Sequence, residues 1–472
     1  MNRFIKHIGL LFISILFIQG CIATKKYERP ETYSVDSFYA DTLTEDTISM
    51  ATLDWREIYN DPILIGYIDE GLKNNLSILK AKQNILASES IFKQRRSNYL
   101  PSINSAFSVG ENYLPTNSYL FQDRPSDTHY TDIVLGGVFS WELDIWGRIT
   151  SLKRSAAAQY MQTINATRYL QTVIISQIVR NYYTLVSLDA KVRILEITIE
   201  NRQKGLEIIN ALKEAGQENA VGVKQSEAFL YKAEGSLLQI MNEIRLVENS
   251  LSILLGRTPG PVDRANWDNI QINEELNIGI PIQLLQNRTD VQAAEYNLIS
   301  AFELTNSARA SFYPTLSINA AGGFNSMDFD NLFSINSLFG NVIGNLTLPL
   351  FNQRKLRTQK EVRLADQQIA YYDYKETILN AYKEVSNSLY TYQNFQELVK
   401  LKRKENRALL DAVLFSEELQ KQGLASYLEV IYAKDNAQVA QFEIVNARLL
   451  QILSVVELYR ALGGGWQPSE IK

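Results

Sequence analysis

Apolar and small polar residues alternate along four short segments of the chain. In the clearest segment, apolar side chains occupy odd positions from Ile133 to Ile145, while Ser140, Glu142 and Asp144 occupy even ones. A period of two predicts a β-strand that has one apolar face and one polar face. The other strands are expected around residues 102–109, 315–319 and 342–350, and the polar insertions expected as outer loops cover residues 111–130 and 325–340.

Much of the remaining chain has a helical pattern. Two stretches, Arg148–Gly216 and Arg354–Gly423, contain no proline, and the first contains a single internal glycine, Gly205. At 1.5 Å per residue, each stretch would extend about 100 Å as a helix. Helices of this length gain most of their stability by packing side by side, so we expect them to lie against other helices.

Glycines predict where these long helices end. Gly216 and Gly423 are expected to adopt the left-handed backbone that closes a helix before a tight turn. The helical pattern resumes after each glycine and continues to Leu255 and Leu462. Each glycine should therefore join two antiparallel helices into a hairpin.

The chain contains the same unit twice. The segment Tyr-Leu-Pro-Ser-Ile around Pro101 resembles Phe-Tyr-Pro-Thr-Leu around Pro314, 213 residues further on. The Leu-Gly pair that ends at Gly256 recurs at Gly463, 207 residues on, and Gly216 recurs at Gly423 with the same offset. Nearly constant offsets indicate a duplication in which each copy reads helix, strand, loop, strand, long helix, break, helix.

The number of strands bears on the oligomeric state. Each strand is about as long as a tilted strand needs to be to cross the hydrocarbon of a bilayer. Four strands cannot close a barrel, and an open sheet edge is not tolerated in lipid. Three copies would supply twelve strands, so a trimer is expected if these strands lie in a membrane.

The N-terminus resembles a secretory signal. Basic residues precede an apolar run, Ile8–Ile18, which is too short to cross a bilayer as a helix of about 20 residues. A glycine then precedes Cys21, the only cysteine in the chain, as in the bacterial lipobox. This pattern predicts cleavage before Cys21 and lipid attachment to it, although a plain signal peptide would share most of these features. No other stretch is expected to form a transmembrane helix.

Composition argues against several function classes. With one cysteine and two histidines, the chain cannot form an internal disulfide or a Cys/His metal cluster. A net charge of −5 argues against a nucleic-acid partner. His129 would have to serve as the base of any histidine-dependent nucleophile, and it lies among loop-like residues. No phosphate-binding Gly-x-x-x-x-Gly-Lys-Ser/Thr motif occurs, so no cofactor is expected and energy would have to come from a partner.

Several motifs resemble one known family. The strongest is Trp-Glu-Leu-Asp-Ile-Trp-Gly-Arg at 141–148. Further matches, in order, are Tyr-Glu-Arg-Pro at 27–30, Asp-Trp-Arg-Glu at 54–57 with Asp61-Pro62, Leu-Leu-Gln-Asn-Arg-Thr-Asp at 284–290, and Ala-Leu-Gly-Gly-Gly-Trp at 461–466. Together they resemble the TolC-type outer membrane factors, and most of all their OprM-like lipoprotein branch. Thr289 stands where that branch has a proline.

The resemblance implies a fold, a function and partners. The fold is mixed α and β: long α-helical hairpins form a periplasmic α-barrel, and four transmembrane strands per protomer close a 12-stranded barrel in a homotrimer. The implied function is a passive exit duct of a tripartite efflux pump, with no enzymatic activity. The implied partners are a periplasmic adaptor protein, an inner-membrane pump of the RND or ABC type, and outer-membrane lipid.

The resemblance also divides the chain into segments. They are a signal peptide at 1–20, a lipid anchor and N-terminal equatorial segment at 21–60, a first repeat at 61–256, a linker at 257–280, a second repeat at 281–462 and a C-terminal tail at 463–472. The hairpin tips implied to meet the adaptor are Gly216, Gln217, Glu218, Ala220, Gly423, Leu424, Ala425 and Ser426.

The periplasmic gate matches the family only in part. Its candidates are Glu418, Lys421, Tyr432 and Asp435. Lys421 and Tyr432 occupy positions that resemble an arginine and its linked aspartate, and these two side chains cannot form a salt bridge. An acidic residue here is more often simply part of a solvated helix face. Two other functions remain open, a structural or adhesive outer-membrane lipoprotein and a periplasmic enzyme, and the cargo and the pump class are not specified.

Overall fold

The computed structural model describes residues 23–31, 54–113, 129–270 and 287–466. The predicted signal peptide and Cys21 lie outside the described residues, as does most of the C-terminal tail. The chain divides into two compact units, and each is composed of three chain segments. Unit one comprises residues 1–31, 85–162 and 294–374, and unit two comprises residues 32–84, 163–293 and 375–472.

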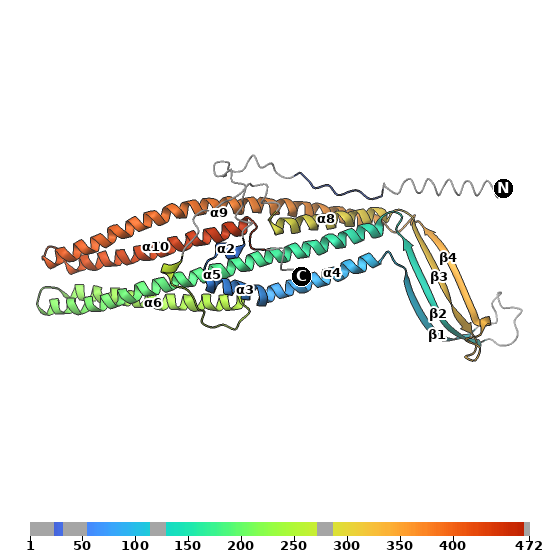
Figure 1. Cartoon of the computed structure of the whole chain (residues 1–472), viewed down its shortest axis with the longest axis horizontal. Helices are drawn as coiled ribbons and strands as arrows, with labels where there is room; N and C mark the ends of the chain where they lie inside the picture. The colour runs from blue at the N-terminus through green and yellow to red at the C-terminus, as the bar shows by residue number, and fades with distance from the viewer. Residues whose placement is uncertain (1–22, 32–53, 114–128, 271–286, 467–472) are drawn as a thin grey trace. The chain divides into compact units, whose positions relative to one another are not determined.

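Unit one contains an antiparallel sheet of four strands in the order β1-β2-β3-β4 (Figure 1). The strands are β1 (Ser102–Tyr113), β2 (His129–Leu143), β3 (Thr315–Ser326) and β4 (Leu338–Thr347). All four extend further into the polar insertions than the alternation predicted, because cross-strand pairing continues there. Thr131, for example, lies opposite Glu111 and donates a 2.7 Å hydrogen bond to its carboxylate. The fourth strand ends earlier than predicted, at Thr347 rather than Leu350, because its partner β3 begins opposite that residue.

The register of the sheet gathers the apolar residues on one face. Phe139 lies between Ile103 on β1 and Ala320 on β3, and the apolar side chains of β2 recur at odd positions, apart from one row of serine and glycine. The opposite face holds most of the polar side chains together with a few apolar ones, and there the Ser140 hydroxyl donates a 2.8 Å hydrogen bond to the Asn319 side chain. Because side chains alternate across a strand, one register fixes both faces. The two-faced sheet predicted from the sequence is therefore confirmed.

The characteristic 141–148 string forms the corner where β2 leads into a helix. The Asp144 carboxylate accepts hydrogen bonds from the backbone N–H groups of Ile149 (2.8 Å) and Thr150 (2.7 Å), which caps helix α5 (Arg148–Glu214). Arg148 pairs with Glu142 at 2.7 Å. Between them Gly147 has a φ of 75°, a left-handed conformation that glycine adopts without strain. The residue types of this string are therefore explained by one tight turn between a strand and a helix.

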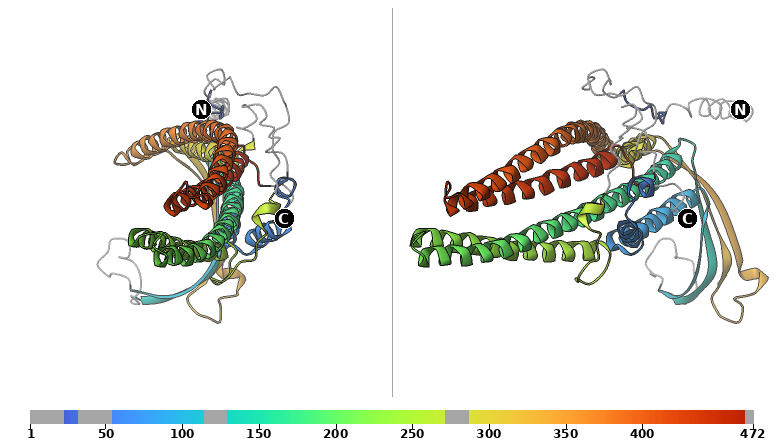
Figure 2. Two further views of the ribbon diagram at one scale, coloured as in Figure 1. Left: turned by 90° about the vertical axis from the view of Figure 1, so that its left-hand side faces the viewer. Right: turned by 60° about the vertical axis from the view of Figure 1, so that its left-hand side comes forward.

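Helices make up most of the rest of the described chain. The remaining elements are α2 (Trp55–Ile58), α3 (Pro62–Asn74), α4 (Leu76–Ser97), α6 (Ala220–Leu254), η5 (Trp267–Asn269), α8 (Thr289–Ala310), η6 (Ile335–Ser337), α9 (Lys355–Lys421) and α10 (Tyr427–Ala461). In unit two, α5 lies antiparallel to α6, and α9 lies antiparallel to α10 (Figure 2). The two hairpins are equal in length, with a first helix of 67 residues and a second of 35. The predicted duplication is thus visible in the helices.

The main core of unit two gathers apolar side chains from several helices. Leu64 and Ile68 of α3, Ile178 and Tyr182 of α5, and Leu458 of α10 are all fully buried in it. Among the described residues, α10 alone is long and apolar enough to cross a membrane, which the sequence analysis did not anticipate. Half of its most apolar stretch is buried inside the chain, so core packing accounts for that composition.

Candidate functional site

Both hairpins end in the same backbone motif. After α5, Gly216 has a φ of 72°, its N–H bonds to the Lys213 carbonyl (3.0 Å), and the next N–H bonds to the Leu212 carbonyl (2.9 Å). After α9, Gly423 has the same φ, and its two bonds reach Gln420 (3.0 Å) and Leu419 (2.9 Å). This is the Schellman ending, which satisfies the last carbonyls of a helix. The left-handed glycines predicted at both tips are confirmed.

Each tip leads directly into a capped helix. The Asn219 side chain accepts a 2.8 Å hydrogen bond from the Val221 N–H at the start of α6. The Ser426 hydroxyl accepts one from the Glu429 N–H at 3.3 Å at the start of α10. Each cap therefore engages one side chain of the tip, Asn219 or Ser426, in a hydrogen bond within the chain. The other predicted docking residues are largely exposed: Gln217, Ala220 and Leu424 are exposed, and Glu218 and Ala425 are half-buried.

The four gate candidates do not form one cluster. Lys421 is exposed, and Glu418, also exposed, accepts a 3.0 Å hydrogen bond from Gln422 in the turn directly after α9. Tyr432 lies on α10 and meets the edge of the Phe229 ring, with centroids 5.5 Å apart. Asp435, one turn further along α10, is only 15% exposed in its side chain. The two candidates at the end of α9 therefore lie outside the polar contacts that Asp435 makes on α10.

Asp435 links α10 to both helices of the other hairpin. Its carboxylate lies 2.7 Å from the guanidinium of Arg202 on α5 and 3.0 Å from the ammonium of Lys232 on α6. Arg202 also donates to the Gln438 side chain at 2.8 Å and to the Phe229 carbonyl. Burial lowers the pKa of Arg202, and the charge of Asp435 opposes that shift. We call Arg202, Lys232 and Asp435 the inter-hairpin triad.

The sequence analysis did not identify Arg202, Lys232 or Phe229. It placed Asp435 among acids that usually belong to a solvated face, whereas the side chain is mostly buried and paired twice. Within the second hairpin, further pairs join α9 to α10: Lys434 lies 2.6 Å from Glu417, and Lys402 pairs with Glu443. Within the described residues, no three His, Cys, Asp or Glu side chains are grouped as metal ligands. The site consists of ion pairs that connect long helices.

Comparison with known proteins gives one consistent result. The sequence model of the family described as outer membrane efflux protein matches the chain twice, at residues 67–257 and 280–464. The antibiotic efflux pump outer membrane protein ArpC of Pseudomonas putida is 28% identical over 463 residues, which cover 97% of this chain and 95% of that protein. The solvent efflux pump outer membrane protein SrpC of the same species is 26% identical over 468 residues, covering 98% and 99%.

Solved structures share the fold. The outer-membrane channel OprN superposes with a TM-score of 0.86 at 23% identity, over 94% of this chain and 99% of that one. Similarity across nearly the whole of both chains includes the sheet and both hairpins.

Proposed function

The chain belongs to the outer membrane efflux protein family and is the outer-membrane channel component of an efflux pump, and from this premise we propose that three copies form one lipid-anchored passive duct. In this proposal the sheets of three protomers close a single twelve-stranded barrel, and their hairpins form the periplasmic α-barrel. Energy comes from an inner-membrane pump of the RND or ABC type, which an adaptor protein connects to the hairpin tips.

The observation that carries the trimer is the open sheet of unit one. Among the described strands, β1 and β4 each have a neighbour on one side only, so both sheet edges carry unpaired backbone groups. The sheet also exposes a large apolar face, with Ile103, Phe107 and Val342 at 74%, 57% and 76% exposure. Apolar strands in lipid must satisfy their edges by closure. Pairing β4 of one copy with β1 of the next supplies that closure.

A disulfide scan tests this pairing directly. Cysteine replaces Asn104 on β1 together with Asn341, Ile343 or Asn345 on β4, all of which lie on the polar face by the observed register. Within one chain β1 and β4 are separated by two strands, about 14 Å at 4.7–4.9 Å per strand step, which is too far for a disulfide. Every bond must therefore join two copies.

The expected product of oxidation in membranes is a covalent trimer for at least one of these pairs. Each single-cysteine variant serves as the control, since it can form only dimers. Exclusive monomer for all three pairs, in protein that still reaches the outer membrane, would contradict the barrel.

The cargo and the tip function follow from the same proposal. The relatives named above are efflux proteins for antibiotics and for solvents, and we infer small organic molecules as the cargo here. The adaptor contacts fall on the exposed tip residues Gln217, Ala220 and Leu424 and on the half-buried Ala425. The anchor is Cys21, lipidated after cleavage of the signal peptide.

We also assign the holding of the closed aperture to the inter-hairpin triad rather than to Lys421 and Tyr432. Breaking the triad removes the ion pairs that hold α10 to the first hairpin, so Asp435→Asn should raise the single-channel conductance of the purified protein in planar bilayers. Glu227→Gln is the matched control, because Glu227 forms an exposed pair with Lys224 on α6 alone. Equal conductance of the Asp435→Asn variant and the unaltered protein would remove the triad from the gate.

A further inference from the structure

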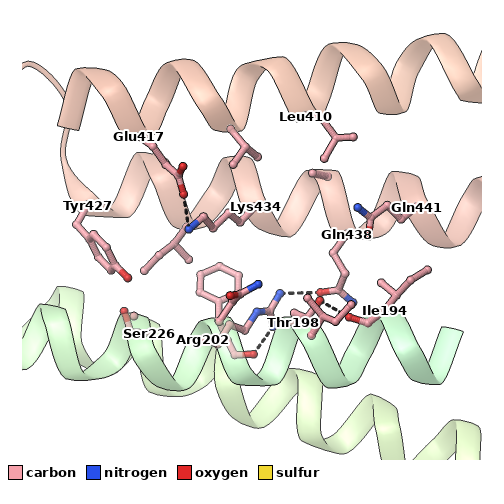
Figure 3. Close-up of a pocket in the computed structure, with 17 residues that line it drawn as sticks. Ile194, Thr198, Arg202, Ser226, Leu410, Glu417, Tyr427, Lys434, Gln438 and Gln441 are labelled. Atoms are coloured by element: carbon pink, nitrogen blue, oxygen red, sulfur yellow. Dashed lines mark hydrogen bonds and ion pairs between the residues drawn. The ribbon is translucent and has the colours of Figure 1, made fainter. Parts of the chain in front are cut away.

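A cavity of about 420 Å³ lies in unit two between the two hairpins (Figure 3). Its walls come from α5, α6, α9 and α10, and they alternate apolar side chains such as Ile194, Leu410 and Ile431 with amides and hydroxyls. The volume falls within the usual range of small-molecule sites, 300–1,000 Å³. The residues that line it come from both hairpins of the chain.

One wall carries a buried hydroxyl that lacks a hydrogen-bond partner. Ser226 of α6 is 4% exposed, lines the cavity, and its Oγ has no partner among the described residues. Buried polar groups in proteins are almost always paired, because an unpaired one costs about 1–3 kcal/mol. In Figure 3, Ser226 and Tyr427 face the same space from opposite hairpins. A bound molecule with a hydrogen-bonding group would satisfy Ser226.

The cavity depends on the lone glycine within α5. A Cβ on Gly205 would lie 2.3 Å from the Tyr427 hydroxyl, so any other residue would push the tyrosine from its place. Glycine inside a helix costs about 1 kcal/mol relative to alanine. Its presence here lets the Tyr427 ring reach from α10 to the surface of α5. The close approach of Tyr427 therefore explains why a glycine occupies this position in the middle of a long helix.

The charges around the cavity are already neutralised. The Lys434 ammonium pairs with Glu417 at 2.6 Å, and Arg202 pairs with Asp435 at 2.7 Å. A charged ligand would have to compete with these pairs and lose its hydration. An uncharged ligand can bind beside these pairs without displacing either of them.

We propose that this cavity binds one small, uncharged, amphipathic organic molecule, which hydrogen-bonds to Ser226 and packs against the apolar walls between the hairpins. The site lies between the two hairpins, and one of its lining residues, Tyr427, directly follows the tip residue Ser426. A ligand held there contacts both hairpins at once, so it stabilises the arrangement in which they lie together.

Photolabelling tests the site with 4-(hydroxymethyl)benzophenone, an uncharged probe with a hydroxyl group and a ketone. On irradiation the ketone inserts into neighbouring C–H bonds, and the adduct is located by peptide mass spectrometry. The full-length protein in lipid nanodiscs should be labelled saturably on peptides that contain Ile194, Leu410 or Ile431. Ser226→Ala removes one hydrogen bond and should weaken apparent affinity about three- to tenfold. Ser226→Leu removes the hydroxyl and projects a larger apolar side chain into the binding volume, so it should abolish saturable labelling at those peptides.

The matched control is Ser236→Leu on the same helix, whose hydroxyl bonds only to the Lys232 carbonyl outside the cavity. It should label as the unaltered protein does. Labelling that does not saturate, that spreads over the whole apolar surface, or that persists in Ser226→Leu would overturn the proposal. Channel conductance plays no part in these readouts, so the result stands apart from the proposed duct.

Discussion

At the scale of single residues, Arg288 is a nearly fully buried charge in unit two that contacts three partners. Its side chain is 2% exposed, and the guanidinium contacts Asp290 at 2.6 Å, Glu384 at 2.9 Å and the Ala461 carbonyl at 2.9 Å. One side chain therefore joins the start of α8 to α9 and to the end of α10. The neighbouring Thr289 is the first residue of α8, where a backbone N–H needs no helical partner. Threonine and the proline of related sequences are both compatible with that position.

Replacing Arg288 should destabilise the protein strongly. Arg288→Met leaves two carboxylates without their buried partner, at a cost of about 3–5 kcal/mol. Lys224→Met, which removes an exposed pair with Glu227, should cost at most about 1 kcal/mol. Thermal unfolding of the two variants in the same detergent measures the contrast. Similar melting temperatures for both would mean that Arg288 carries little of the stability of the fold.

A second residue-scale prediction concerns the faces of the sheet. Phe139 lies on the apolar face and Ser140 on the polar face of β2. If the apolar face meets lipid, Phe139→Arg should cost about 2–4 kcal/mol near the bilayer midplane. Ser140→Arg should be tolerated better, because its side chain would point into a watery lumen. Trimer yield after outer-membrane extraction decides between them, and a lower yield for Ser140→Arg would invert the assignment.

At the scale of elements, the hairpin tips are expected to govern docking rather than folding. Ala220 is exposed and makes no cap, so Ala220→Trp should leave trimers heat-stable while abolishing efflux and adaptor crosslinking. Ser426→Trp also removes a helix cap, which costs about 1 kcal/mol. Ser426→Ala is therefore its control, since it loses the cap without adding bulk. Normal efflux and crosslinking in both tryptophan variants would exclude the tips from docking.

How much of each element could be predicted depends on how local its signal is. The ends of the long helices were predicted to within a few residues, because the glycines that close them act through their own backbone. The end of β4 was placed too late, since a strand stops where its partner stops, and β3 begins elsewhere in the chain.

The site was harder to predict for the same reason. The tip glycines are visible in the sequence, whereas Asp435 and Arg202 lie 233 residues apart. Only the packing of one hairpin against the other brings this pair together, and apolar spacing along a helix does not define the register between two helices. Ser226 likewise cannot be told from other helical serines in the sequence, because the cavity beside it forms only when the two hairpins pack together.

At the scale of the whole molecule, the anchor and the barrel should act independently. Cys21→Ser should abolish incorporation of radioactive palmitate and weaken retention in the membrane. It should leave the trimer intact, because the apolar strand faces insert without the lipid. Labelling with palmitate and the yield of heat-stable trimer are measured on the same preparation. Palmitate incorporation at the level of the unaltered protein would contradict the lipobox assignment.

The equal lengths of the two hairpins restrict how this protein can evolve. One residue inserted into a helix turns every later side chain by about 100° around the helix axis, which would move its buried stripe into solvent. Substitutions in the hairpins are therefore accepted more readily than insertions or deletions. The offset between the copies is 213 residues at Pro101 and 207 at the starts of α5 and α9, so the change in length lies among the strands and their connections. Foreign peptides inserted for display should be tolerated in the connections between the strands and rejected within the helices and the strands themselves.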